Sequence, residues 1–182
     1  MAFPKALNRA LTLPSSLLLL ALTSCGQPAS QCQQLITLIN DSQPFAQDYE
    51  QSINTSLGKV SSAQNLPELK AAASDYMGTV QDASVGSSNL ARSLSELSIT
   101  DEQLSSYRDR YAAVATQWSN ALVSAREAMQ LLAEADSEEA FQREFDRFQA
   151  KTNSAYSLLQ SVDNEESQLI EGINSYCQQE AS

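Results

Sequence analysis

The sequence predicts an all-α protein, an up-down-up-down four-helix bundle with long antiparallel helices. Apolar residues recur every seven residues along four successive segments, which is the spacing of helices that pack side by side. The joins between these segments are only a few residues long, so sequential helices must run antiparallel. Glycine and proline number five each, too few for a turn-rich β fold.

Residues 1–24 have the composition of a secretory signal peptide. Lys5 and Arg9 give a basic head without an acid, and an almost wholly apolar stretch follows over 10–23. This stretch is too short to cross a bilayer, which takes about 20 apolar residues. We therefore expect 1–24 to direct export and to be removed.

The signal ends in Leu22, Thr23, Ser24 and Cys25. This motif resembles the lipobox of bacterial lipoproteins, in which the signal is cut before the cysteine and that cysteine then carries acyl chains. The resemblance implies that Cys25 is the lipid attachment site and that the lipid holds the protein at a membrane. An ordinary cleaved signal with a chance cysteine after it is the alternative. Residues 25–31 are expected to be the lipidated cysteine and a short polar tether.

The bundle domain is expected over 32–178, and its first helix over about 31–61. The apolar stripe of this segment is the weakest of the four, and Pro44 lies inside it. Proline lacks a backbone N–H and disfavours the helical conformation of the residue before it. The helix should therefore kink there, or an opening helix should end near Ser42. The stripe consists of Cys32, Leu35, Ile39, Ser42, Ala46, Tyr49, Ile53, Ser56 and Val60.

The second helix is expected over 66–98. Asn65 is placed as its cap, with Pro67 in the first turn and Glu68 at the third position. The segment 86–89 has poor helix propensity, but the apolar phase runs through it unbroken. One imperfect helix is expected, with a break near Gly86 as the alternative.

The third and fourth helices are expected over 101–135 and 137–178, followed by a tail at 179–182. The segment 100–103 reads as a capping box that begins at Thr100, with Ile99 and Leu104 as a hydrophobic staple. Asp136 is placed as the cap of the fourth helix by the same pattern. Acids gather at these helix starts, where the helix dipole favours them.

The three cysteines are Cys25, Cys32 and Cys177. If Cys25 carries lipid, two remain, and an exported protein is where two cysteines form a disulfide. In an up-down-up-down bundle Cys32, in the first turn, and Cys177, in the last turn, lie at the same end. We therefore predict a Cys32–Cys177 disulfide that closes nearly the whole domain into one loop. Free thiols used for redox or metal chemistry are the alternative.

Charge and composition argue against several functions. Without the two basic residues of the leader, nine basic and 22 acidic residues remain, a net charge of −13 that opposes nucleic-acid binding. The chain has no histidine, so it lacks the commonest general base and the commonest metal ligand. No catalytic residue, cofactor or metal ligand is assigned, and we expect a protein that is not an enzyme.

Two sets of residues have a second interpretation. Tyr107, Tyr111 and Trp118 form an aromatic stripe that core packing explains, with a ligand box as the alternative. The acid pairs at 138–139 and 165–166 belong to solvated helix faces, with a weak divalent-cation site as the alternative. Glu166 falls on the apolar stripe and would need a partner such as an arginine.

The segments 32–36, Cys-Gln-Gln-Leu-Ile, and 173–177, Ile-Asn-Ser-Tyr-Cys, open and close the bundle. This cysteine placement resembles a group of cyanobacterial lipoproteins without an assigned activity. In architecture alone the chain is similar to the PsbQ-like and related lipid-anchored helical proteins of the lumenal face of photosystem II. These resemblances imply export to the periplasmic face of a membrane or to the thylakoid lumen.

Two classes of function remain. The first is a non-catalytic scaffold or accessory factor that docks on a protein partner, and an exposed apolar patch would favour it. The second is a carrier or sensor that binds an apolar ligand or a cation, and a cavity lined by the aromatic stripe would favour it. The far loops at 61–65 and 135–137 should lie about 45 Å from the anchored end, where a partner is first expected.

Overall fold

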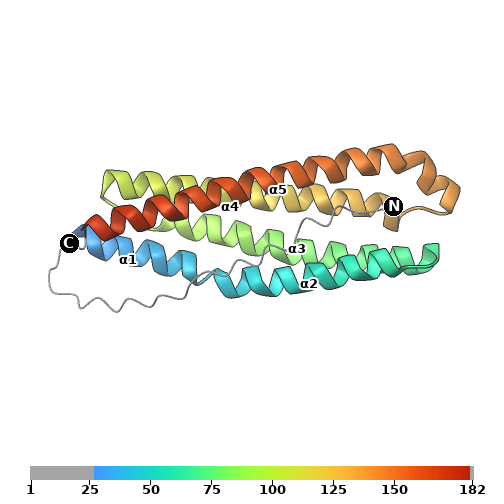
Figure 1. Ribbon diagram of the computed structural model, residues 1–182, viewed down its shortest axis with the longest axis horizontal. Coiled ribbons are helices and arrows are strands. Elements are labelled where there is room, and N and C mark those ends of the chain that lie inside the picture. The colour runs from blue at the N-terminus through green and yellow to red at the C-terminus, as the bar shows by residue number, and fades with distance from the viewer. Residues whose placement is uncertain (1–26, 181–182) are drawn as a thin grey trace.

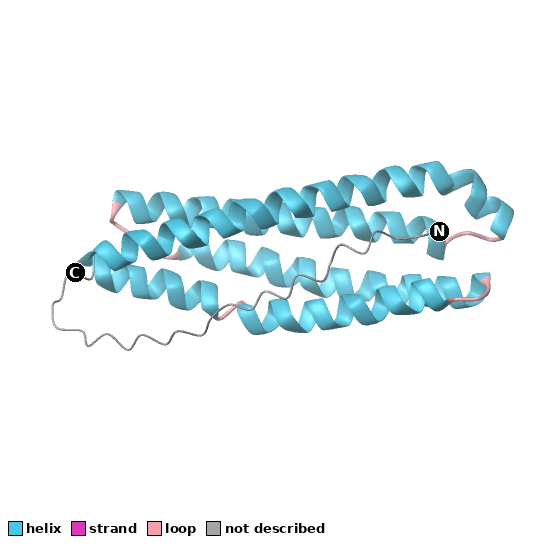
Figure 2. Cartoon of the chain, in the orientation of Figure 1, coloured by secondary structure: helices cyan, strands magenta, loops and turns pink. Residues whose placement is uncertain are grey.

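The computed structural model describes residues 27–180, and this part of the chain consists of helices joined by short turns and loops, without a strand (Figures 1 and 2). Five helices pack against one another along the long axis of the molecule. They are α1 (Gln27–Asn40), α2 (Gln43–Ser62), α3 (Leu66–Glu96), α4 (Glu102–Ala133) and α5 (Glu138–Glu180). The predicted all-α class is confirmed.

The first predicted helix is two helices, α1 and α2. Asp41 and Ser42 form a turn between them, in which the Ser42 hydroxyl donates to the Ile39 carbonyl at 2.6 Å. Pro44 lies in the first turn of α2, where its missing N–H leaves no helix hydrogen bond unmade. Of the two outcomes that Pro44 allowed, the ended helix is therefore the observed one.

The tether was predicted too long. Helix α1 begins at Gln27, so most of the segment 25–31 is helix, with Pro28 tolerated in its first turn. At the other end of the chain α5 runs to Glu180, two residues beyond the predicted boundary. The predicted signal at 1–24 and the lipid attachment site Cys25 lie outside the described residues.

The predicted cap of α3 is confirmed, and α3 runs unbroken past Gly86. The Asn65 side chain accepts a hydrogen bond from the Glu68 backbone N–H at 3.0 Å. The caps predicted for the last two helices were each wrong by one residue. Asp101, and not Thr100, accepts from the Leu104 N–H at 2.7 Å, and Ser137, and not Asp136, accepts from the Ala140 N–H at 3.1 Å.

The core consists of two apolar clusters along the rod. The first surrounds the disulfide end and includes Leu35, Leu104 and Leu169, each at most 1% exposed. The second lies towards the opposite end and includes Val80, Leu122 and Met129. Helix α1 contributes to the first cluster, and α2 and the first half of α5 border the second.

Helices α3 and α4 approach each other through small residues. Ser84, Ser87 and Ser119 are buried between them and bond across the interface. The Ser84 and Ser119 hydroxyls are 2.8 Å apart, and the Ser87 hydroxyl donates to the Ala115 carbonyl at 2.6 Å. Small polar residues therefore let the two backbones approach closely without leaving a buried hydroxyl unpaired.

Helix α2 and the first part of α5 are the least covered elements. Helix α2 packs mainly on α3, and α5 packs on α4. Of the α2 side chains that the structure describes, Ser56 alone is buried, and the buried residues of α5 begin at Ala155. None of the described helices combines the length and the apolar character that a membrane span requires.

Candidate functional site

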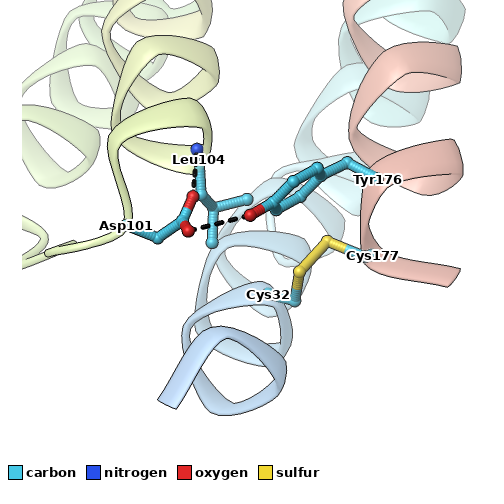
Figure 3. The surroundings of a disulfide bond; sticks show 5 residues. All are labelled: Cys32, Asp101, Leu104, Tyr176 and Cys177. Atoms are coloured by element: carbon cyan, nitrogen blue, oxygen red, sulfur yellow. Dashed lines mark hydrogen bonds between the residues drawn. A yellow bond between two sulfur atoms is a disulfide. The ribbon is translucent and has the colours of Figure 1, made fainter. Parts of the chain in front are cut away.

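The start of α1 and the end of α5 are joined by the disulfide that the sequence predicted. Cys32 and Cys177 are linked, with their Cα atoms 5.7 Å apart and 145 positions apart in the sequence (Figure 3). Both residues are buried against the first apolar cluster, at 4% and 9% exposure. The covalent link therefore fixes both ends of the helical domain at one end of the rod.

A hydrogen-bonded carboxylate lies beside the disulfide (Figure 3). Asp101 accepts from the Leu104 backbone N–H through Oδ1 and from the Tyr176 hydroxyl through Oδ2, at 2.7 and 2.8 Å. The backbone N–H of Leu104 and then the Tyr176 hydroxyl hold the pKa of the Asp101 carboxyl below its ordinary value. The same hydrogen bond raises the pKa of Tyr176 to about 12. One carboxylate thus caps α4 and holds α5.

Gln31 joins α1 to the loop between α3 and α4. Its side-chain oxygen accepts from the backbone N–H groups of Thr100 and Asp101 at 2.8 and 3.1 Å. Its side-chain nitrogen donates to the Thr100 hydroxyl at 2.7 Å. The residue is 8% exposed, so these bonds are largely protected from water. Together with the disulfide and Asp101, Gln31 ties α1, the loop and α5 at the same end.

The partner of Glu166 is a tyrosine. The Tyr111 hydroxyl on α4 donates to Glu166 Oε1 on α5 at 2.5 Å, so the arginine suggested for this position is not needed. Burial, with the Glu166 charge as the second cause, raises the pKa of Tyr111 far above its ordinary value. The same carboxylate adds to the effect of desolvation in raising the pKa of Asp163. This bond joins α4 and α5 in the middle of the rod.

The predicted acid pairs do not assemble a metal site within residues 27–180. No group of three or more cysteine, aspartate or glutamate side chains in that range is placed to hold a metal ion. Glu165 lies 3.8 Å from Arg110 in an exposed ion pair, and Glu138 and Glu139 lie in the first turn of α5. Glu165 therefore forms a surface ion pair, and Glu138 and Glu139 interact favourably with the dipole at the start of α5.

The aromatic stripe of α4 is part of the packed interior. Tyr111 is 3% exposed, and Tyr107 and Trp118 pack against the first cluster. Trp118 also meets Tyr49 of α2 edge to face, with ring centroids 5.0 Å apart. Two surface hollows, one between α2 and α3 and one between α3 and α4, have polar side chains in their walls and none of these three aromatic residues.

Three phenylalanines form a partly exposed patch at the other end of the rod. Phe141, Phe145 and Phe148 lie on α5, and we call them the aromatic edge. The Phe145 ring stacks on Phe148 at 6.3 Å and meets Phe141 edge to face at 5.9 Å. Phe141 and Phe148 also pack against the second cluster. No side chain between 138 and 154 is buried.

Sequence reasoning missed the hydrogen bonds of Gln31 and Tyr176 and the exposure of the aromatic edge. Gln31 and Thr100 are 69 positions apart, and no local pattern links a glutamine to a distant loop. The three phenylalanines follow the same seven-residue repeat as buried core positions. One available signal was the weak apolar stripe of the segment 43–62, which indicates that this part of the bundle is less completely packed.

Comparisons with family models, with curated proteins and with solved structures find no match to this chain.

Proposed function

We propose that the protein is a membrane-anchored lipoprotein that acts as a non-catalytic scaffold or accessory factor and docks on a protein partner through the aromatic edge. The observation that carries the proposal is the partial exposure of three phenylalanines on an element without a buried side chain from 138 to 154. Partly exposed apolar residues that form a cluster mark interaction surfaces more often than single exposed ones.

The anchor is proposed at Cys25, which only Gly26 separates from α1. A lipid on Cys25 would place the disulfide end of the rod next to the membrane. Acyl chains give membrane affinity through their buried methylene groups, and no membrane-spanning helix is needed for it. The predicted locations are the periplasmic face of a membrane or the thylakoid lumen.

We further propose an up-down-up-down four-helix bundle in which α1 and α2 together occupy the position of the first helix. Helices α3, α4 and α5 are the second, third and fourth. The disulfide between the start of α1 and the end of α5 supports this topology, as do the short connections between α2, α3, α4 and α5. In this arrangement the first helix is interrupted at 41–42. Its second part, α2, then packs less tightly on the far half of the bundle than α1 packs on the anchored half.

The geometry supports a partner far from the membrane. Phe145 precedes Cys177 by 32 residues on the same helix, about 48 Å at 1.5 Å per residue. The anchored end is closed by a disulfide and by partly buried hydrogen bonds, whereas the far end presents aromatic side chains. A rod that is anchored at one end and presents an apolar binding surface at the other is suited to hold a partner above the bilayer.

The test is photocrosslinking in native membranes, with a photoreactive amino acid in place of Phe145 of the full chain. The matched control carries it in place of Val85 of α3, which is 49% exposed. We expect a discrete adduct from position 145 and none of that size from position 85. Equal labelling from both positions, or no adduct from position 145, would contradict docking through the aromatic edge.

A further inference from the structure

We propose that the partner docks through a basic amphipathic helix, which lies along the side of the molecule between α2 and the first part of α5. The inference rests on the proposed function, because it gives the chemistry of the partner that the aromatic edge holds. Two observations carry it. Helices α2 and α5 barely pack on each other, and the side chains on the facing sides of both helices are apolar or acidic.

The far half of the molecule leaves one side of α2 and one side of α5 uncovered. Helix α2 packs mainly on α3 and α5 packs mainly on α4, and within residues 27–180 contact between α2 and α5 is marginal. At the other end α1 is joined to α5 by the disulfide and packs on it. Figure 1 shows α2 and the start of α5 along opposite edges of the molecule. Two helices therefore each offer an uncovered side to one further helix.

Phe145 lies on the side of α5 that faces α2. Burial, to which charge interactions with Tyr76 and Asp163 add, raises the pKa of Tyr49 on α2, so Asp163 of α5 lies close to the start of α2. Phe145 precedes Asp163 by 18 positions, about five turns at 3.6 residues per turn, so the two share one side of α5. Tyr156, 39% exposed, lies between them on the same side.

The uncovered side of α2 is marked by Leu57. Contacts with α3 come from Ser56 and from Lys59, which pairs with Asp75 at 2.6 Å. Leu57 lies about 160° around the helix from Lys59 and is 38% exposed. It follows by about one turn Ile53, which packs on the second apolar cluster. We call the apolar residues on these two sides the docking strip: Ile53, Leu57, Phe145 and Tyr156.

The charges beside the docking strip are acidic. On α5, Glu138 and Asp146 lie within about 100° of Phe145, and Asp163 shares its side. On α2, Glu50 points away from α3, about 180° around the helix from Lys59. A partner helix with Lys or Arg beside its apolar face would therefore meet opposite charges, whereas an acidic helix would be repelled.

The basic residues of the same two helices point elsewhere. Lys59 pairs with α3, and Lys151 pairs with Glu127 of α4. Arg143 and Arg147 each lie about 160° around α5 from Phe145. The docking strip thus has no basic neighbour on α2 or α5 within the described residues.

The shape of the strip favours a helix as the bound element. Its apolar side chains come from two helices, and an amphipathic helix buries its apolar face against such a surface. From Phe145 to Asp163 the strip extends about 27 Å at 1.5 Å per residue, which matches a partner helix of about 18 residues.

The experiment measures fluorescence anisotropy of labelled peptides of about 18 residues, matched to that length. The first peptide contains leucine and lysine, with leucine at helical spacing. The second replaces lysine by glutamate, and the third is a scrambled leucine–lysine sequence of the same composition. The protein is the full chain in phosphatidylcholine nanodiscs, and empty nanodiscs give the background. We expect the first peptide to bind at least about tenfold more tightly than the other two.

Two pairs of variants locate the binding. L57S/F145S should weaken binding of the first peptide at least about tenfold, whereas V85S/V123S, at exposed positions of α3 and α4, should leave it unchanged. E50K/D146K should also weaken it, whereas D82K/E134K, which changes the net charge equally on α3 and α4, should have little effect. Circular dichroism melts establish that each variant remains folded.

Equal binding of the glutamate or the scrambled peptide would overturn the proposal, as would binding that survives L57S/F145S. Equal losses in the two charge variants would also overturn it, because net charge alone would then account for the binding. Failure of the proposed function would look different. If position 145 crosslinks a protein in membranes but the first peptide does not bind, the basic helix is excluded and the docking face stands.

Discussion

The hydroxyl of Tyr176 donates a hydrogen bond to the carboxylate of Asp101 at 2.8 Å, which joins the last turn of α5 to the cap of α4. Tyr176 directly precedes Cys177, so this bond and the disulfide hold the same turn of α5 (Figure 3). The end proposed to face the membrane is therefore fixed by a covalent bond and a network of hydrogen bonds.

The network predicts a dependence of stability on pH. The pKa of Asp101 is lowered in the folded protein, so its contribution is present above the ordinary value of 3.8 and is lost as the pH falls through the lower folded value. Asp101→Asn keeps a capping side chain but removes the charge. Urea unfolding from pH 7 to pH 2 should show the wild-type advantage shrinking below about pH 4. An advantage that is constant over this range would contradict the assignment.

Tyr176→Phe removes only the hydroxyl. We expect the free energy of unfolding to fall by about 1 kcal/mol, the usual value of a single hydrogen bond. Tyr156→Phe is the matched control, because Tyr156 is 39% exposed and its hydroxyl accepts from the Gln160 side chain in an exposed pair. Equal losses in the two variants would mean that the bond between Tyr176 and Asp101 has no special role.

Removing the disulfide should be the most damaging of these changes. Chain entropy assigns a loop of this size about 5 kcal/mol, since the closed loop covers nearly the whole domain. Cys32→Ala/Cys177→Ala should therefore lower the midpoint of urea unfolding strongly. A change of a few tenths of a kcal/mol would show that the bond contributes little to the fold.

Two glycines of the helices give opposite predictions. A Cβ on Gly172 would lie 2.9 Å from Cε1 and Oη of Tyr107, whereas one on Gly78 would meet nothing within 4 Å. Gly78→Ala should stabilise the protein by about 0.5 to 1 kcal/mol, because alanine is the better helix former. Gly172→Ala should be less stable than Gly78→Ala by about 1 to 3 kcal/mol, the typical cost of overpacking.

The control for this pair uses thermal melts in a Tyr107→Ser background. There the difference between the two alanine variants should largely disappear, because the ring that the new methyl group meets is gone. A difference that persists would place the strain elsewhere than at Tyr107.

The contact between α3 and α4 predicts intolerance of large residues. Ser119 is 7% exposed and bonds to Ser84 and Ser88, so Ser119→Leu should force the helices apart and cost about 1 to 3 kcal/mol. The neighbouring Asn120 is exposed, and Asn120→Leu should change the free energy of unfolding by less than about 0.5 kcal/mol. Chemical unfolding measures the free energy of unfolding of both variants. Equal losses for Ser119→Leu and Asn120→Leu would contradict close packing at Ser119.

Much of the fold follows from periodicity. The repeat through Tyr76, Val80 and Ala83 predicts one continuous α3, and those residues are buried as expected. Cys32 and Cys177 are paired because helix order and length bring the two ends together. Both inferences depend on local spacing and chain connectivity, which a single sequence contains.

The remaining features depend on tertiary context. Pro44 allowed either a kink or a helix end, and the bond from Ser42 to the Ile39 carbonyl accompanies the second. Phe141, Phe145 and Phe148 carry the same pattern as core residues, yet they remain partly exposed because α2 lies mainly on α3 and does not cover them. The repeat therefore marks which residues are apolar, while the paths of neighbouring helices decide which are covered.

The orientation of the rod, and with it the proposed function, depends on Cys25 and the Cys32–Cys177 disulfide acting together. The most direct test is mass spectrometry of the protein extracted from membranes, digested without reduction. We predict that the chain begins at Cys25 with acyl chains attached, and that the peptides containing Cys32 and Cys177 are joined. An unmodified Cys25, a chain that retains residues before it, or Cys25 in a disulfide would contradict the account.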